Sequence, residues 1–184
     1  MSVSRTSNIS LVRTLRPSFV CFSIFPMEDE RFLVSTVAHP RPVRTITVQG
    51  HEGEVQHAGL PDKTYKAADS MCTYIVEHKT LVFTDRQAHA VYMCNIESGK
   101  CQTVQSVNIQ KPCGACPGNH GTVFVCSKDT NTLVQLSLRG EILMSHNVGM
   151  VFPLAVSLST DGSRVAVSNC AEGQKMIKVF QVTS

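Results

Sequence analysis

The sequence lacks several features that would assign a function directly. It contains no tryptophan, and aromatic residues make up only 6% of its 184 residues. No apolar run approaches the roughly 20 residues that a helix needs to cross a bilayer, so we expect no membrane partner. A glycine-rich phosphate loop and a Gly-x-Ser-x-Gly motif are also absent. Nothing in the sequence therefore indicates catalysis, and we predict that the chain is not an enzyme.

The bulk composition is that of a globular, strand-rich protein. Charged residues make up 17% and hydrophobic residues 42%, and Val, Thr and Ser are abundant. A net charge of +3 is too small to indicate nucleic-acid binding by itself. Several of the eight cysteines, such as Cys94 and Cys126, lie inside apolar runs, where a thiol behaves as a small buried hydrophobe. We therefore expect a reducing compartment and a cytoplasmic protein.

The most informative feature present is an apolar run that recurs about every 42 residues. The runs cover residues 81–83, 123–126 and 165–167, and Asp85, Asp129 and Asn169 follow them. A fixed period in this range indicates a repeat architecture. We predict an all-β fold, a β-propeller-like array of about four antiparallel four-stranded blades. The expected divisions are an N-terminal segment, 1–17, and blades at about 18–64, 65–110, 111–150 and 151–184.

The last repeat shows the expected strands most clearly. Residues 154–158 and 164–168 form apolar runs on either side of an Asp161-Gly162 turn, and residues 177–182 alternate. We name the four strands of a blade a to d, from the inside of the propeller outwards. The residues of the a strands that we expect in the core are Val20, Phe22, Ile24, Ile75, Leu154, Val156 and Leu158.

The two ends of the chain leave two arrangements open. Residues 9–15 alternate like a d strand, and they would close a four-blade ring by pairing with residues 177–182. Closure removes exposed sheet edges, which otherwise favour aggregation. The alternative is that the chain is a fragment of a larger, six-bladed propeller.

Two segments of the third repeat carry a resemblance to a known family. The segment from Asp129 to Leu136, followed by the segment from Arg139 to Leu143, resembles a blade of the NHL-repeat propellers. Such propellers are found at the C-terminus of tripartite-motif (TRIM) proteins, where they bind protein partners or RNA. The resemblance implies a binding module. Ubiquitin-ligase activity in that family belongs to a RING domain, which this chain does not contain.

Two local motifs admit a structural and a chemical interpretation. Cys113 and Cys116 form a Cys-x-x-Cys pair with His120 close behind, which is half of a zinc site or a redox pair. No second pair follows at finger spacing, so we interpret the segment as an inner strand. Asp85 and Asp129 recur at matched positions, and we expect each carboxylate to accept backbone N–H groups in a turn. The histidines are dispersed, and we expect neither a metal nor another cofactor.

The distribution of charge gives the most useful functional clue. In a propeller, the b–c loops and the d–a connections between blades emerge on one face, which we call the b–c/d–a face, and the a–b and c–d loops emerge on the opposite face. The opposite face collects most of the acidic residues, and Tyr65 is the only aromatic residue that we assign to the b–c/d–a face. The candidate binding residues on the b–c/d–a face are Arg41, Lys63, Lys66, Arg86, Lys111, Lys128 and Lys175.

A basic face attracts acidic proteins or phosphates. We therefore predict a non-catalytic module that docks a protein partner through the b–c/d–a face. RNA binding through the same face is the first alternative, although RNA usually needs aromatic stacking platforms as well. A metal-dependent propeller hydrolase or lactonase is the second alternative.

Overall fold

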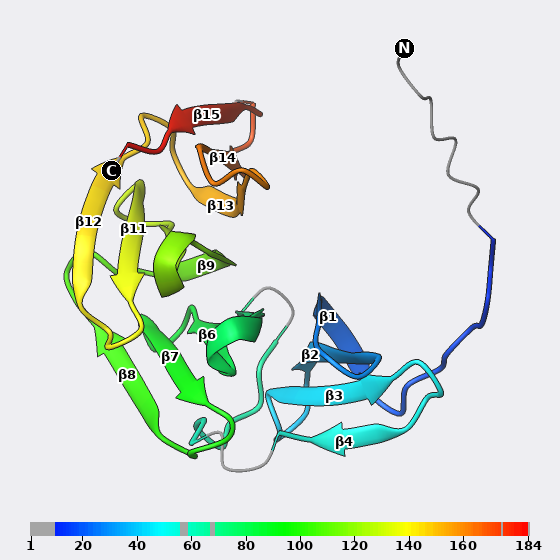
Figure 1. The fold of residues 1–184 in the computed structure, drawn as a ribbon. Helices are drawn as coiled ribbons and strands as arrows, with labels where there is room; N and C mark the ends of the chain where they lie inside the picture. Colours follow the sequence, from blue (N-terminus) through cyan, green and yellow to red (C-terminus); the bar gives the residue numbers. More distant parts are fainter. Residues whose placement is uncertain (1–9, 56–58, 67–68, 174, 184) are drawn as a thin grey trace.

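The described part of the chain is built almost entirely from antiparallel β-sheet. The structure is a computed structural model that describes residues 10–55, 59–66, 69–173 and 175–183. Four small sheets follow one another around an arc as the blades of a four-blade β-propeller, with their first strands toward the centre (Figure 1). The predicted fold class is confirmed.

Three blades have four strands and the last has three. Blade 1 contains β1 (Val20–Pro26), β2 (Arg31–Val37), β3 (Val43–Thr47) and β4 (Glu52–Glu54). Blade 2 contains β5 (Ser70–Ile75), β6 (Thr80–Asp85), β7 (Ala90–Asn95) and β8 (Cys101–Gln105). Blade 3 contains β9 (Pro112–Pro117), β10 (Thr122–Ser127), β11 (Thr132–Ser137) and β12 (Ile142–Asn147). Blade 4 contains β13 (Pro153–Leu158), β14 (Arg164–Asn169) and β15 (Ile177–Gln181). Two 3₁₀ turns, η1 (Val76–His78) and η2 (Asn119–Gly121), join the a and b strands of blades 2 and 3.

Tight turns connect the strands where the sequence places glycine. Gly99 and Gly140 lie between the c and d strands of blades 2 and 3, with φ of 70° and 76°. This left-handed conformation costs glycine little, because it has no Cβ. The turns fix the strand register, which pairs Cys94 with Cys101 in blade 2 and Thr132 with Asn147 in blade 3.

The core lies between the blades rather than inside any one of them. Val82 and Val91 of blade 2 pack against Val123 and Val134 of blade 3, and all four are buried. Burying each such side chain contributes about 1.5–3 kcal/mol. A blade is therefore stabilised mainly by its neighbours, because the apolar faces of adjacent sheets pack against each other.

The predicted core residues are only partly confirmed. Ile75 is 2% exposed, as expected, and Leu154 and Val156 pack, half-buried, against blade 3. Val20 and Ile24 in β1 are each 64% exposed, so their predicted burial is wrong. They belong to the first blade of the arc, which has a neighbouring blade on one side only. Phe22 of the same strand is also exposed.

The N-terminal segment does not close the ring in the described residues. Residues 10–17 form no strand, and β15 pairs with β14 alone. The Arg13 guanidinium instead donates to the Gln49 carbonyl over 3.1 Å, which places this segment beside blade 1. The predicted pairing with residues 177–182 is therefore not observed. Residue 9, which was part of that prediction, lies outside the described residues.

One pair of cysteines departs from the expectation of buried thiols. Cys94 of β7 and Cys101 of β8 form a disulfide between directly paired positions of blade 2. Cys72, Cys113, Cys116 and Cys126 are buried free thiols, and Cys21 and Cys170 are exposed free thiols. Among the described helical turns, none is long and apolar enough to cross a membrane.

Candidate functional site

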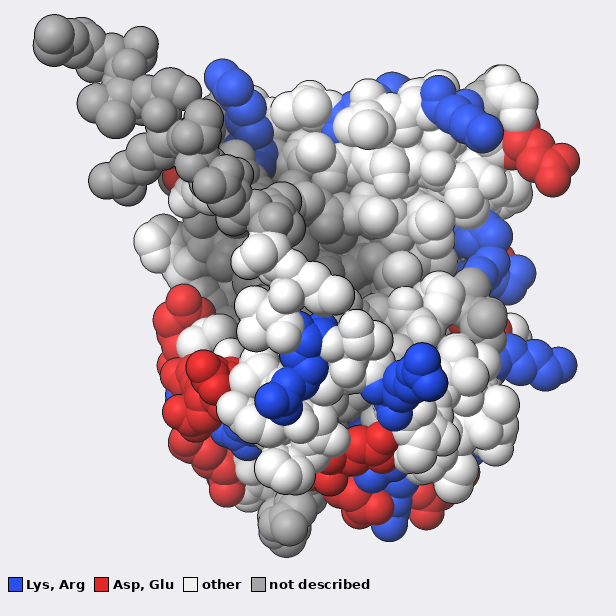
Figure 2. Space-filling model, turned by 90° about the vertical axis from the view of Figure 1, so that its right-hand side faces the viewer, with Lys and Arg blue, Asp and Glu red and all other residues white. Residues whose placement is uncertain are grey.

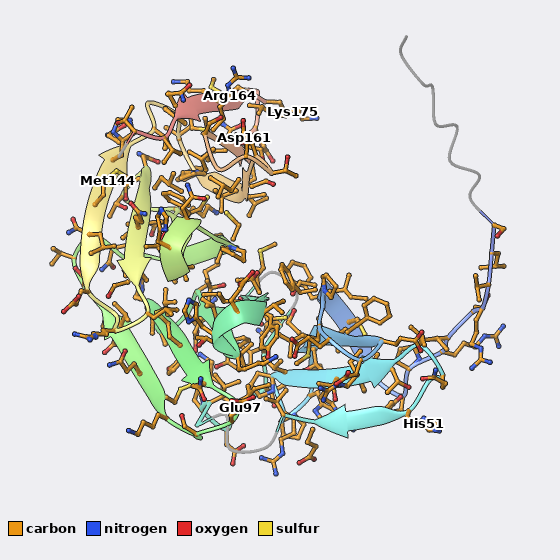
Figure 3. The ribbon with its side chains drawn as sticks, in the orientation of Figure 1. His51, Glu97, Met144, Asp161, Arg164 and Lys175 are labelled. Atoms are coloured by element: carbon orange, nitrogen blue, oxygen red, sulfur yellow. A yellow bond between two sulfur atoms is a disulfide. The ribbon has the colours of Figure 1, made fainter. Side chains whose placement is uncertain are left out.

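The seven candidate basic residues all lie in loops at the b–c/d–a edge of their blades. Arg41, Arg86, Lys128 and Lys175 follow b strands, whereas Lys63, Lys66 and Lys111 precede a strands. Figure 2 looks at the open side of the arc, where acidic side chains gather at the lower left and several Lys and Arg lie along the right margin. The residues do not form one cluster, because they are spread over the loops of all four blades. Lys175, for example, lies at the open side of blade 4 and points away from the arc (Figure 3).

Lys63 belongs to a buried network rather than to an open binding surface. Its Nζ lies 2.6 Å from Oδ2 of Asp85, which is fully buried. The Tyr65 hydroxyl donates to the same oxygen over 2.9 Å. Burial, and then the Asp85 hydrogen bond, raise the pKa of Tyr65 well above its usual range, so the hydroxyl remains a donor. Tyr65 is 1% exposed and is therefore a core residue, not the surface aromatic that the sequence indicated.

The expected turn role of Asp85 is confirmed and that of Asp129 is not. Oδ1 of Asp85 accepts from the N–H groups of Gln87 and Ala88 over 3.0 and 2.8 Å, which fixes the β6–β7 turn. The Asp129 carboxylate instead pairs with Lys111 over 2.8 Å. The two aspartates do not occupy matched positions, because Asp85 is the last residue of β6, whereas Asp129 lies two residues beyond Ser127, the last residue of β10.

Other basic candidates are also neutralised by neighbouring carboxylates. Arg41 lies 3.7 Å from Glu54 and 3.7 Å from Asp62. Together with the pairs of Lys63 and Lys111, these contacts remove much of the positive potential that the sequence predicted for this face. The sequence could not reveal this, because each pair joins residues from separate segments of the chain.

The best-defined feature of the b–c/d–a face is a platform made by Phe152 and Lys128, which sequence reasoning missed. Phe152 lies in the β12–β13 connection with φ of 56° and is 42% exposed. The Lys128 ammonium lies 4.8 Å from the centroid of its ring, within the range of a cation–π contact. The sequence feature that could have indicated this platform is the pair of large apolar residues Val151 and Phe152 in a predicted d–a loop.

The inner end of β9 lies close to this platform. Burial raises the pKa of Cys113, and the positive charges of Arg86 and Lys128 act in the opposite direction. The Lys111 N–H, directly before β9, donates to Nδ1 of His89, and the Lys128 N–H donates to the Lys111 carbonyl. The loops that carry Arg86 and Lys128 therefore meet at the start of β9, on the b–c/d–a edge of blades 2 and 3.

The Cys-x-x-Cys pair is part of an inner strand, as expected. Cys113 and Cys116 both lie in β9, and burial raises the pKa of Cys116 to about 12. A thiol with so high a pKa is a poor nucleophile at neutral pH. His120 lies in η2, beyond the opposite end of the strand from Cys113. Among the described residues, no three His, Cys, Asp or Glu side chains come together as a ligand set for a metal ion.

A pocket of about 320 Å³ lies between blades 3 and 4. Its lining includes Phe124, Met144, His146 and Phe180, and the His146 ring stands edge-on to the Phe180 ring with centroids 5.5 Å apart. The volume is at the lower end of the range for small-molecule sites. The polar side chains of the lining are those of Gln135, His146, Gln181 and Thr183.

Comparisons with known proteins show the fold alone. No protein-family profile and no curated protein matches the chain. Among solved structures, hydrazine synthase of Kuenenia stuttgartiensis is similar with a TM-score of 0.69 at 12% identity, over 95% of this chain and 49% of that chain. A streptogramin B lyase is similar with a TM-score of 0.63 at 15% identity, over 91% and 56%. The virginiamycin B lyase of Staphylococcus aureus gives 0.61 at 15% identity, over 89% and 56%. The chain thus spans about half the length of these structures.

These neighbours contradict the prediction that the chain is not an enzyme. All three are enzymes by name, so the fold itself gives no ground for excluding catalysis. The low identities confine the likeness to the propeller. None of these three neighbours is named as an NHL-repeat or TRIM protein.

Proposed function

We propose that this propeller is a binding module that docks a protein segment on its b–c/d–a face, as the resemblance to NHL blades implies. The contact centre is the platform of Phe152 and Lys128, with Arg86 beside it. The preferred segment carries an apolar side chain next to acidic ones. The apolar group would pack on Phe152, and the carboxylates of the segment would face Lys128.

The conformation of Phe152 is the observation that carries this proposal. A bulky residue at positive φ is uncommon and costs about 1–3 kcal/mol. Two backbone contacts hold it there: its N–H donates to Oδ1 of Asn131 over 2.9 Å, and its carbonyl accepts from the Cys170 N–H over 3.1 Å. These contacts fix the backbone of Phe152, whose aromatic side chain is partly exposed to solvent. Strain of this kind concentrates at sites of recognition, and rigid aromatic anchors commonly dominate interface energies.

A protein segment fits this face better than RNA does. Lys63, Lys111 and Arg41 already face carboxylates of the same chain, so the surface offers few unneutralised cations to a polyphosphate. RNA affinity depends mainly on such cations and on rows of stacking aromatics. One aromatic ring with one or two cations is suited to a short peptide motif.

The proposal is tested with fluorescein-labelled peptides and fluorescence anisotropy. A peptide of alternating Glu and Leu is compared with oligo-Glu and with a Lys–Leu peptide of equal length, and labelled oligouridylate serves as the RNA probe. We expect the Glu–Leu peptide to bind most tightly. Phe152→Ala is expected to weaken it by about 2 kcal/mol, roughly 30-fold, as at an aromatic hot spot. Lys128→Glu is also expected to weaken binding of the Glu–Leu peptide, and the effect is expected to be largest at low salt.

Two matched variants serve as controls. Leu143→Ala removes an exposed apolar side chain from β12, and Lys100→Glu reverses a charge in the c–d turn on the opposite face. Neither is expected to change the affinity for the peptide. Equal loss in Phe152→Ala and Leu143→Ala would disprove the platform as the contact centre. Tighter binding of oligouridylate than of any peptide would favour RNA instead.

A further inference from the structure

The c strand of blade 4 has the composition of an interior strand but the environment of an edge. In blades 2 and 3 a d strand covers the corresponding strands, β7 and β11, which are mostly buried. In the described residues β15 has no such cover, and Ile177 and Val179 are 71% and 63% exposed. Among the described residues, no strand lies on the outer side of β15.

The backbone hydrogen bonds show which groups of β15 are available. The Val182 N–H donates to the Ser163 carbonyl over 2.8 Å, and the Asn169 N–H donates to the Met176 carbonyl over 3.4 Å. In an antiparallel pair, alternate residues bond to the same neighbour, so the even-numbered residues of β15 bond to β14. The N–H and C=O groups of Ile177, Val179 and Gln181 consequently point away from the sheet.

The exposed edge lacks the usual protection against pairing. Natural edge strands carry outward charges, prolines or bulges that keep other strands away. The one charged side chain of β15, Lys178, is turned back into its own chain, where its Nζ donates to the carbonyls of Val148 and Gly149. The three outward residues, Ile177, Val179 and Gln181, are uncharged.

We propose that β15 pairs antiparallel with β15 of a second copy of this chain, about a twofold axis at Val179. This register brings Val179 opposite Val179 and Ile177 opposite Gln181, so the outward backbone groups of each copy meet those of the other. It is self-complementary, as a twofold interface requires. Lys178 falls opposite Phe180 of the second copy, so no like charges face one another.

The pairing joins the two blades into one six-stranded sheet. The face of blade 4 that is turned away from blade 3 carries mostly small, apolar or uncharged residues, with Arg164 as its one charged strand residue. Beyond Ile177, Val179 and Gln181 the uncharged ones are Ala155, Ser157, Ala166 and Ser168. The surface is separate from the platform of Phe152 and Lys128, so this inference does not depend on the proposed function.

The inference is tested by sedimentation equilibrium of the full chain between about 5 and about 300 µM. A short strand pair buries less than a standard interface, so we expect a weak dimer with a Kd of about 10–100 µM. Val179→Pro removes one outward N–H without touching the β14 ladder, and it is expected to weaken the dimer at least 10-fold. Proline is tolerated on an edge strand where its nitrogen faces solvent.

The matched control is Ser145→Pro on β12, another exposed edge strand. Since the Val148 N–H donates to the Asn131 carbonyl, the Ser145 N–H also points outward, and its replacement is expected to leave the dimer unchanged. Ile177→Lys provides a second disrupting variant that keeps the backbone intact, and far-UV circular dichroism checks the folding of each variant. Deletion of residues 1–12 is expected to preserve the dimer.

Each contrary result overturns the inference. A wild-type chain that is monomeric at 300 µM has no such interface. Loss of the dimer on deletion of residues 1–12 assigns the outer side of β15 to the N-terminal segment instead. If Val179→Pro and Ser145→Pro weakened the dimer equally, the association would not be specific to the edge of β15.

Discussion

Removal of the Asp85 carboxylate is expected to destabilise the propeller more than any other single change of a charged residue. Asp85 is fully buried and has four partners: the Lys63 ammonium, the Tyr65 hydroxyl and the N–H groups of Gln87 and Ala88. Asp85→Ala leaves two backbone donors, a buried hydroxyl and an ammonium without their acceptor. Leaving a buried donor unsatisfied costs about 1–3 kcal/mol, and breaking a buried ion pair costs about 3–5 kcal/mol. These costs overlap, because all the partners share one carboxylate. Lys63 is 34% exposed and regains part of its hydration, so we expect a total near 4 kcal/mol.

Asp85→Asn separates the contribution of the turn hydrogen bonds from that of the negative charge. The amide oxygen still accepts from Gln87 and Ala88, whereas the amide NH2 group replaces the oxygen that accepted from Lys63 and Tyr65, so a donor faces the ammonium. We expect this variant to cost about 1.5–3 kcal/mol, the value of a hydrogen bond to a charged group. The difference between the two variants then measures the contribution of the β6–β7 turn and its buried contacts.

Urea unfolding followed by far-UV circular dichroism measures both variants, since the chain has no tryptophan to report on folding. Asp129→Ala is the control, because that carboxylate is 35% exposed and pairs with the exposed Lys111. A pair of this kind contributes at most about 1 kcal/mol. If Asp85→Ala cost no more than Asp129→Ala, the reasoning from burial and partner number would be refuted.

Three further changes test other parts of the structure. Phe83→Ala, in the core between blades 1 and 2, is expected to cost about 3–5 kcal/mol in urea unfolding, and a cost below 1 kcal/mol would contradict the packing. Replacing Cys94 and Cys101 together by Ser opens a loop with a sequence separation of 7 and is expected to cost about 2 kcal/mol, a loss that dithiothreitol reproduces in the wild type and not in the variant. Hydrogen bonds from Ser159 and Ser163 lower the pKa of Asp161 to about 2 from 3.8. Its carboxylate therefore stabilises the fold above about pH 4, and this contribution disappears as the pH falls through 2. Asp161→Asn should lose less stability than the wild type between pH 4 and pH 2, and parallel curves would contradict this.

The sequence by itself determined the blades. The period of 42 residues, the apolar runs and the glycine turns are local signals, since a β-strand needs only alternation and a turn needs only a residue that tolerates its backbone angles. The role of Asp85 could be predicted for the same reason, because its N–H partners lie two and three residues away. The inner-strand interpretation of Cys113 and Cys116 followed from their composition and from the missing ligand partners.

Only the tertiary structure decided the surface chemistry and the ends of the arc. The pairs of Lys63 with Asp85, and of Phe152 with Lys128, join segments that are distant in the sequence, and a repeat period carries no information about which of these segments meet. Burial of β1 and β15 likewise depends on whether another strand or blade covers them. Covered and uncovered strands show the same apolar alternation, so the sequence does not distinguish them. Local pattern fixes what each strand is able to bury, whereas packing between blades decides what it does bury.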